Sequence, residues 1–161
     1  VVAHQHLPIF HTEHCVFCRF LSNGNDYTDC GHPCERHNLH LRDSNGKDHK
    51  VLADMGCRNT VFNAKAQSAA MDLAAFASAQ VGFLRLELVD EVPDAVGTLV
   101  RRYHSAASGR LPADKLWNYV ASLGDSNGRR QGVERGSLDD GMWRERDVTE
   151  MKVPAASQAG R

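Results

Sequence analysis

The chain has 161 residues, a formal net charge of −1 at pH 7 and an isoelectric point near 6.8. This length suits one domain or a piece of one, and the near-neutral charge excludes the strongly basic surface typical of nucleic-acid and anionic-membrane binding proteins. No signal peptide or transmembrane run is visible, so we expect a cytoplasmic protein without a membrane partner.

All five cysteines lie within the first 57 residues, and four of them form close pairs. Two residues separate Cys15 from Cys18, three separate Cys30 from Cys34, and Cys57 follows Gly56. Thiolates at such short spacings can point at one ion or cluster, because the loop between them turns the backbone back on itself. We therefore predict a soft-metal centre with all five thiols as candidate ligands.

Three other interpretations of the cysteines compete with this one. Disulfides are disfavoured by the odd count and by an alanine-rich sequence that should bury a core without covalent cross-links, and inert buried thiols are a further alternative. A four-thiolate zinc site uses the same ligand type as an iron–sulfur cluster, and the spacing leaves both open. A fifth nearby cysteine favours the cluster mildly, since one cluster ligand can come from a distant loop.

The first 50 residues are rich in histidine, asparagine and glycine, and predict short strands and turns. A strand within residues 1–9 ends at Pro8, and an Asn45-Gly46 turn joins strands at residues 40–42 and 51–53 into a hairpin. On such a first strand His4 and His6 share one face. They could bind a metal or a substrate there, but we favour histidines that are hydrogen-bonded to the backbone.

The middle of the chain predicts helices and a strand in alternation. Asn63 caps a helix over residues 64–80, and residues 83–89 alternate as a strand with Arg85 and Glu87 on one side. A second helix begins at Pro93 and ends at Gly109. Its apolar stripe comprises Val96, Leu99, Val100, Tyr103 and Ala107.

The remaining residues predict one short helix over residues 112–123, followed by a polar tail. The expected organisation is a cysteine-rich segment over residues 1–60, βα units over 61–110, and a helix with a flexible tail over 111–161. Alternating strands and helices favour an α/β fold with a parallel sheet, which two or three strands do not complete. We therefore expect the C-terminal portion of a larger barrel or doubly wound sheet.

Four runs of sequence together resemble the collagenase-like peptidases of unknown catalytic type. They are LPIFHTEHCVFC at residues 7–18, DCGHPCE at 29–35, ADMGCRNTVFNA at 53–64 with Gln-Ser following at 67–68, and LRLELVDE at 84–91. They cover roughly residues 4–105 in the family's order. The departure is the compact Cys-x-x-Cys, which many members space further apart.

The resemblance implies a TIM-like barrel entered at a late strand. The family is named for protease activity, but several branches bind a four-iron cluster and hydroxylate RNA bases or a ubiquinone precursor without oxygen. By the family pattern Cys15, Cys18 and Cys30 match ligand positions, and the fourth ligand is Cys57 or Cys34. The substrate class stays open between RNA, a quinone precursor and protein.

Four side chains are candidates for contact with the substrate or cluster: Glu13, His14, Arg58 and Glu87. The first two adjoin Cys15, Arg58 follows Cys57, and Glu87 could line a barrel interior with Arg85, although an ion pair between these two is an equal alternative. No Gly-x-Ser-x-Gly or His-Glu-x-x-His motif occurs. We expect an iron–sulfur hydroxylase; the alternatives are a peptidase of collagen-like or unfolded protein and a non-catalytic zinc-stabilised module.

Overall fold

The structure of the protein is a computed structural model that describes residues 1–54 and 56–139. One sheet contains β1 (Val2–Gln5), β6 (Ala66–Ser68), β7 (Arg85–Leu86) and β8 (Val133–Glu134). Its strand order is β7-β1-β6-β8. The β1–β7 and β6–β8 pairs are parallel, whereas β1 and β6 are antiparallel.

The second sheet is antiparallel throughout and carries the cysteine loops. Its strands are β2 (Pro8–Thr12), β5 (Asn59–Phe62), β4 (Asp48–Ala53) and β3 (Leu39–Arg42), in that order across the sheet. The turn between β3 and β4 holds Gly46 at a φ of 79°, a conformation that costs glycine little. The predicted hairpin is therefore confirmed.

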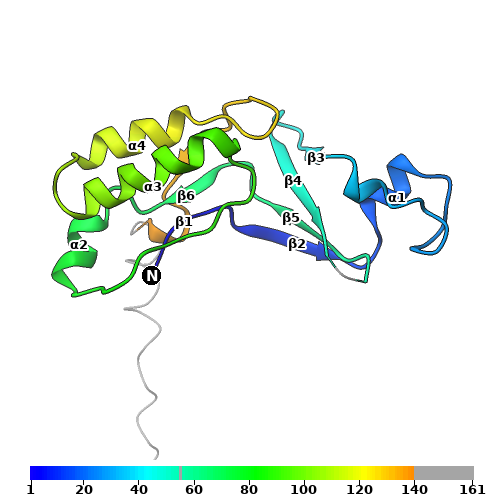
Figure 1. Cartoon of the computed structure of the whole chain (residues 1–161), viewed down its shortest axis with the longest axis horizontal. Helices are drawn as coiled ribbons and strands as arrows, with labels where there is room; N and C mark the ends of the chain where they lie inside the picture. Colours follow the sequence, from blue (N-terminus) through cyan, green and yellow to red (C-terminus); the bar gives the residue numbers. More distant parts are fainter. Residues whose placement is uncertain (55, 140–161) are drawn as a thin grey trace, which may run out of the picture.

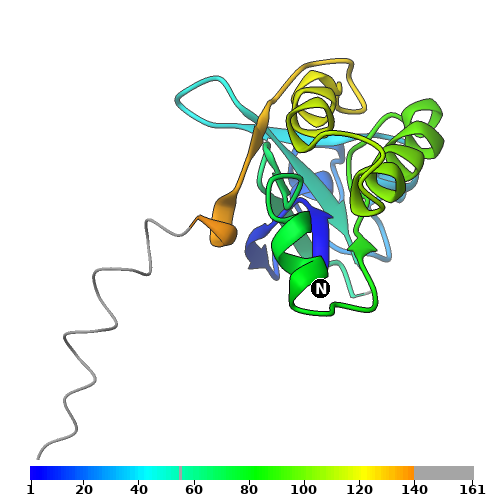
Figure 2. The ribbon, with the colours of Figure 1, turned by 90° about the vertical axis from the view of Figure 1, so that its left-hand side faces the viewer.

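Three helices gather over the first sheet (Figure 1): α2 (Leu73–Ser78), α3 (Pro93–Ala107) and α4 (Ala113–Ser122). Helices α3 and α4 run side by side above the strands (Figure 2). Pro93 begins α3, where a missing N–H costs nothing, and Gly109 follows its end at a φ of 72°. The core below them contains Ala3, Ala66, Ala69, Ala70, Leu73, Leu99, Tyr103, Leu116 and Val120.

The opposite end of the molecule has a much smaller core. Helix α1 (Val16–Leu21) and the 3-10 turn η1 (Pro33–Glu35) pack against each other there. Phe17, Val51 and Val61 are the buried apolar side chains between them and the second sheet. This end therefore depends on loops for much of its structure.

The predicted helix over residues 64–80 is wrong in its first half. Residues 66–68 form the buried strand β6 between β1 and β8, and the helix begins only at Leu73. Alanines at 66, 69 and 70 are buried, as predicted, but against strands. Alanine's helix propensity is a weak preference, and pairing with two neighbouring strands overrides it here.

Smaller differences concern strand ends and one helix face. The predicted strand at residues 83–89 pairs only at Arg85–Leu86, and the strand expected to end at Pro8 is two strands, the second of which starts at that proline. The helices expected from Pro93 and over residues 112–123 are confirmed. Val100, which is 47% exposed, and Ala107, which is also exposed, do not belong to the apolar stripe of α3.

The mixed α/β class is confirmed, but the sheet is not purely parallel. Among residues 1–54 and 56–139 the strands form two separate sheets, and no barrel is closed. No helix in this part of the chain is both long and apolar enough to cross a membrane. The predicted polar tail falls largely on residues 140–161, which lie outside the described residues.

Candidate functional site

The first two cysteines lie at the start of α1. Cys15 is the N-cap residue, and its sulfur accepts a hydrogen bond from the Cys18 amide at 3.4 Å. The Cys18 thiol is buried and donates to the Gly24 carbonyl at 3.3 Å. Burial, with the nearby Cys30 and Cys15 sulfurs, raises the pKa of Cys18.

The second pair lies on the loop that returns from α1. The Asp29 carboxylate accepts the backbone amides of Asp26 and Asn25, which lowers its pKa and fixes the turn that leads into Cys30. Gly31 and His32 then both adopt left-handed backbone, with φ of 67° and 54°. Pro33 begins η1 directly after them, and η1 carries Cys34.

Cys57 lies between β4 and β5 in a conformation unusual for its residue type. Its φ is 63° and that of Gly56 is 81°. A left-handed backbone is uncommon for residues with a Cβ, and such strain concentrates at functional sites. The Asn59 amide donates to the Cys57 carbonyl at 3.3 Å, which helps to hold this loop.

Asn59 also joins the Cys57 loop to the Cys15 loop. Its side-chain oxygen accepts the Val16 amide at 2.6 Å, and its nitrogen lies 3.9 Å from the Cys15 sulfur. The residue is fully buried and belongs to β5, so the sheet fixes its position. One side chain thereby determines how two of the three cysteine loops approach each other.

Four thiols line one cavity of about 380 Å³: Cys15, Cys30, Cys34 and Cys57. Burial and the sulfurs of Cys15, Cys30 and Cys34 raise the pKa of Cys57, as expected for thiols that face one another. The sulfurs surround a space and are not drawn to one point, since no three of them lie within 4.8 Å of one another in the described residues. Cys18 lines an adjacent hollow that it shares with Cys15.

The structure divides the expected catalytic residues between two places. His14 lines the hollow with Cys15 and Cys18; Glu13 precedes it on the same exposed loop. Arg58 precedes Asn59, which pairs with Thr12, so it lies across from the Glu13 loop. Glu87 follows β7 of the other sheet: its amide donates to the His4 carbonyl, and its carboxylate pairs with Arg85 at 2.9 Å. The described structure therefore does not bring Glu87 to the thiols.

A second group of ligating side chains lies between β1 and the residues after β7. His4 Nε2 is 2.6 Å and His6 Nε2 is 3.2 Å from the same oxygen of Glu91. The other oxygen of that carboxylate accepts the Val89 and Asp90 amides. Both histidines and the glutamate are almost fully buried, and the paired imidazoles hold the pKa of Glu91 far below its usual range despite burial.

A third group surrounds Asp90. His40 Nε2 lies 2.8 Å from one of its oxygens, while Ser126 donates to the other at 2.6 Å and Lys50 approaches it at 3.2 Å. These hydrogen bonds and the lysine charge lower the pKa of Asp90 against the opposing effect of burial. Asp125 lies close to His40 and Asp90.

Sequence reasoning found the thiols but missed both carboxylate–histidine groups. His4 and His6 were expected to bond to the backbone. His6 does so, through Nδ1 to the Asn63 carbonyl at 2.7 Å, but both rings also meet Glu91. An available signal was the Asp90-Glu91 pair directly after a strand, because acidic residues at strand ends often meet side chains from a neighbouring strand.

No family model, curated protein or solved structure matches the chain in comparisons with known proteins.

Proposed function

We propose that the chain is the cluster-binding part of an iron–sulfur enzyme related to the collagenase-like peptidases, with its parallel strands β1 and β7 forming part of a larger TIM-like barrel. The proposed reaction is oxygen-independent hydroxylation of an RNA base or a quinone precursor. One observation carries the proposal: Cys15, Cys30, Cys34 and Cys57 reach a single cavity from three separate loops.

The dimensions of this cavity favour a cluster over one ion. Tetrahedral zinc holds its sulfurs about 2.3 Å away, and therefore about 3.8 Å from one another. No three of the described thiols lie within 4.8 Å of one another, which is wider than one zinc ion requires, whereas a four-iron cluster is a bulky group whose ligands stand further apart. The left-handed backbone at Cys57 supports a ligand role for this residue, because a strained loop needs a functional reason to persist.

The ligand set proposed from this arrangement is Cys15, Cys30 and Cys57, with Cys34 or Cys18 as the fourth. Cys18 faces the adjacent hollow and donates to a carbonyl, so Cys34 is the better placed of the two. When bound, the cluster would supply one-electron chemistry. The Asn59 amide would tune it by donating toward the Cys15 sulfur.

The residues around the cavity would serve the substrate. Arg58 is exposed beside Cys57 and offers a fixed positive charge to a phosphate or carboxylate group. His14 lines the neighbouring hollow and offers an imidazole that can form hydrogen bonds with a substrate. Glu87 is left out of this assignment because it pairs with Arg85 in the other sheet.

The test is reconstitution of the protein with iron and sulfide in the absence of oxygen, followed by absorbance and metal analysis. We expect a broad visible absorption and roughly four irons per chain. Cys34→Ser and Cys18→Ser should separate the fourth ligand: the variant that keeps its iron has lost the spare thiol. Ser44→Ala, in the β3–β4 hairpin, is the matched control and should load fully.

Two outcomes would overturn the proposal. A colourless protein with one tightly held zinc, lost on chelation together with the fold, would indicate a zinc-stabilised module. Cleavage of gelatin by purified protein, retained in the cysteine variants, would indicate a peptidase whose chemistry does not need the thiols.

A further inference from the structure

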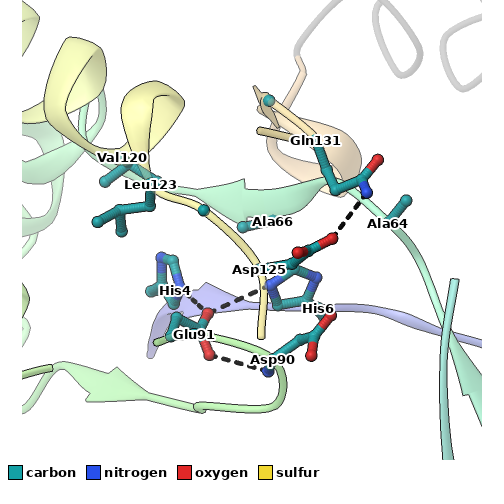
Figure 3. A pocket seen from close by; sticks show the side chains of 12 residues that line it. His4, His6, Ala64, Ala66, Asp90, Glu91, Val120, Leu123, Asp125 and Gln131 are labelled. Atoms are coloured by element: carbon teal, nitrogen blue, oxygen red, sulfur yellow. Dashed lines mark hydrogen bonds and ion pairs between the residues drawn. The ribbon is translucent and has the colours of Figure 1, made fainter. Parts of the chain in front are cut away.

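A small cavity lies where β1 faces Asp90 and Glu91, below the end of α4 (Figure 3). Its volume is about 20 Å³, which is room for one water-sized group. His4, His6 and Glu91 point toward one another at its wall, and their ligating atoms all lie within 4.8 Å of one another. The site therefore has the size of a single ion.

The hydrogen bonds of His6 leave one nitrogen without a suitable partner. Its Nδ1 faces the Asn63 carbonyl at 2.7 Å, and a carbonyl only accepts, so the proton of a neutral ring is on Nδ1. Nε2 then presents a lone pair to a carboxylate oxygen of Glu91 at 3.2 Å. Two acceptors at this distance repel each other unless a cation lies between them.

The net charge of His4, His6 and Glu91 also requires a cation. With neutral imidazoles the group carries one negative charge, on a glutamate side chain that is 4% exposed. A buried uncompensated carboxylate is costly, and two backbone amides only partly offset that cost. The cation is either a proton on a histidine or a metal ion.

The neighbouring group around His40 needs no such cation. Its Nε2 can donate to Asp90 while its Nδ1 accepts from the Asn127 amide at 3.1 Å. Lys50 supplies a positive charge beside Asp90, and the Asp125 carboxylate, the third member of this group, accepts the Asn127 and Arg129 amides and the Gln131 side-chain N–H. Every polar atom of this histidine is thus satisfied in the neutral form, which makes it a natural internal control.

We propose that His4, His6 and Glu91 bind one divalent transition-metal ion, zinc or ferrous iron. Two imidazoles and one carboxylate are the protein ligands of catalytic zinc sites and of non-haem iron sites that keep open positions. Bonds of about 2.0–2.2 Å place such ligand atoms roughly 3.3 Å apart. The His6–Glu91 spacing already matches this value, and the shorter His4–Glu91 contact opens by less than an ångström.

The surroundings supply the outer contacts that metal-binding histidines need. The Asn63 carbonyl orients His6, and the Tyr103 hydroxyl lies 3.3 Å from His4 Nδ1, where its oxygen can accept that N–H. The site is separate from the thiols and does not depend on the proposed cluster.

The test is a cobalt titration of the metal-free wild-type protein and of three variants: His6→Gln, Glu91→Gln and His40→Gln. We expect the wild type and His40→Gln to bind one more cobalt ion than the other two variants. In the difference spectrum between wild type and His6→Gln the visible bands should lack thiolate charge transfer, because cobalt bound by cysteine contributes equally to both. Competition with zinc and, without oxygen, with ferrous iron then identifies the preferred metal.

Equal cobalt binding by wild type, His6→Gln and Glu91→Gln would overturn the proposal and leave a proton as the bridging cation. If the variants do not fold, the cobalt titration of the wild-type protein alone tests the proposal. The wild-type titration can also overturn the proposal. If the visible bands and the thiolate charge-transfer band grow in constant proportion from the first equivalent of cobalt to saturation, all the cobalt is bound by cysteines. We expect His6→Gln to weaken the site by more than the roughly 10–100-fold that loss of an outer partner costs.

Discussion

The two ends of the molecule carry their ligating side chains on different kinds of structure. At the cysteine end the thiols lie on three loops above a core of three buried apolar side chains. At the helix-covered end His4 lies on β1, His6 directly follows that strand, and Glu91 precedes α3, over a core of nine buried apolar side chains. The comparison indicates that the second group is held by the fold itself, whereas the first depends on its loops.

Each arrangement also has a free-energy cost, and the two costs arise in different parts of the structure. His32 and Cys57 hold left-handed backbone beside the cysteine cavity, so strain there is in the main chain. Around His4 the backbone is regular strand, and the cost is burial of a charged carboxylate. A bound metal would relieve the second cost directly. The backbone strain at the cysteine end would be offset only by a bound group that holds the loops together.

Removal of a core leucine should separate the two ends most strongly. Leu99 lies on the buried face of α3 and is fully buried. We expect Leu99→Ala to lower the free energy of unfolding by about 2–5 kcal/mol. Leu52, which is 39% exposed on β4, gives the matched change in the other sheet and should cost much less. Urea denaturation of both variants measures the difference. Equal losses would mean that the two sheets share one stabilising core.

Removal of a single hydroxyl group should have the next largest effect. The Tyr103 hydroxyl lies 2.6 Å from Ser68 Oγ and 3.2 Å from the Ala3 carbonyl, besides its contact with His4. Burial raises the pKa of Tyr103, so the hydroxyl stays protonated. We expect Tyr103→Phe to cost about 1–3 kcal/mol, because buried polar partners lose a hydrogen bond.

Tyr27→Phe is the control for this change at the cysteine end. Tyr27 is 66% exposed, so loss of its hydroxyl should leave the free energy of unfolding unchanged within about 0.5 kcal/mol. Thermal or urea unfolding of the two variants side by side gives the comparison. A Tyr103→Phe variant as stable as Tyr27→Phe would mean that its hydrogen bonds contribute nothing net.

The sequence predicted well those features that depend on local chemistry. The Asn45-Gly46 turn, Pro93 at the start of α3 and Gly109 after its end are set by the backbone limits of those residues, and the structure has all three. Each close pair shares a hollow, Cys15 with Cys18 and Cys30 with Cys34, but no spacing in the sequence places Cys57 beside them. Whether these thiols bind a metal, and which one, depends on sulfur geometry, which spacing does not encode.

Features that depend on long-range pairing were not predictable in the same way. Residues 66–68 read as helix because alanine favours helices, and only the neighbours β1 and β8 make them a strand. Glu91 lies 87 residues from its partner His4, and no local pattern links the two. Val100 shows the same limit on a helix face, since an apolar residue at a core spacing is still exposed where no element covers it.

A small, pH-dependent effect is expected at the β3–β4 turn. The amide of Lys47, followed by the contacts with His49 and Asn45, lowers the pKa of Asp43. Its stabilisation is therefore present above about pH 4, the pKa of the unfolded chain, and is lost as the pH falls through the lower folded value. Asp43→Asn keeps an oxygen acceptor and removes the charge. The melting-temperature difference between wild type and variant should shrink between about pH 5 and pH 2; a constant difference would contradict this.

The smallest change in stability should accompany the loss of a proposed ligand. Cys15 caps α1 through its sulfur, and serine is among the best N-cap residues, so Cys15→Ser preserves the cap with a shorter, stronger acceptor. We expect the free energy of unfolding of the metal-free protein to stay within about 0.5 kcal/mol of wild type. Iron retained after anaerobic reconstitution should nevertheless fall about tenfold or more, measured against Ser44→Ala. A variant that loses stability and iron together would show that Cys15 acts through the fold; retention of iron would remove it from the ligand set. Stability unchanged with iron lost is the result that assigns the thiol to metal binding, because serine keeps the helix cap while it removes the sulfur.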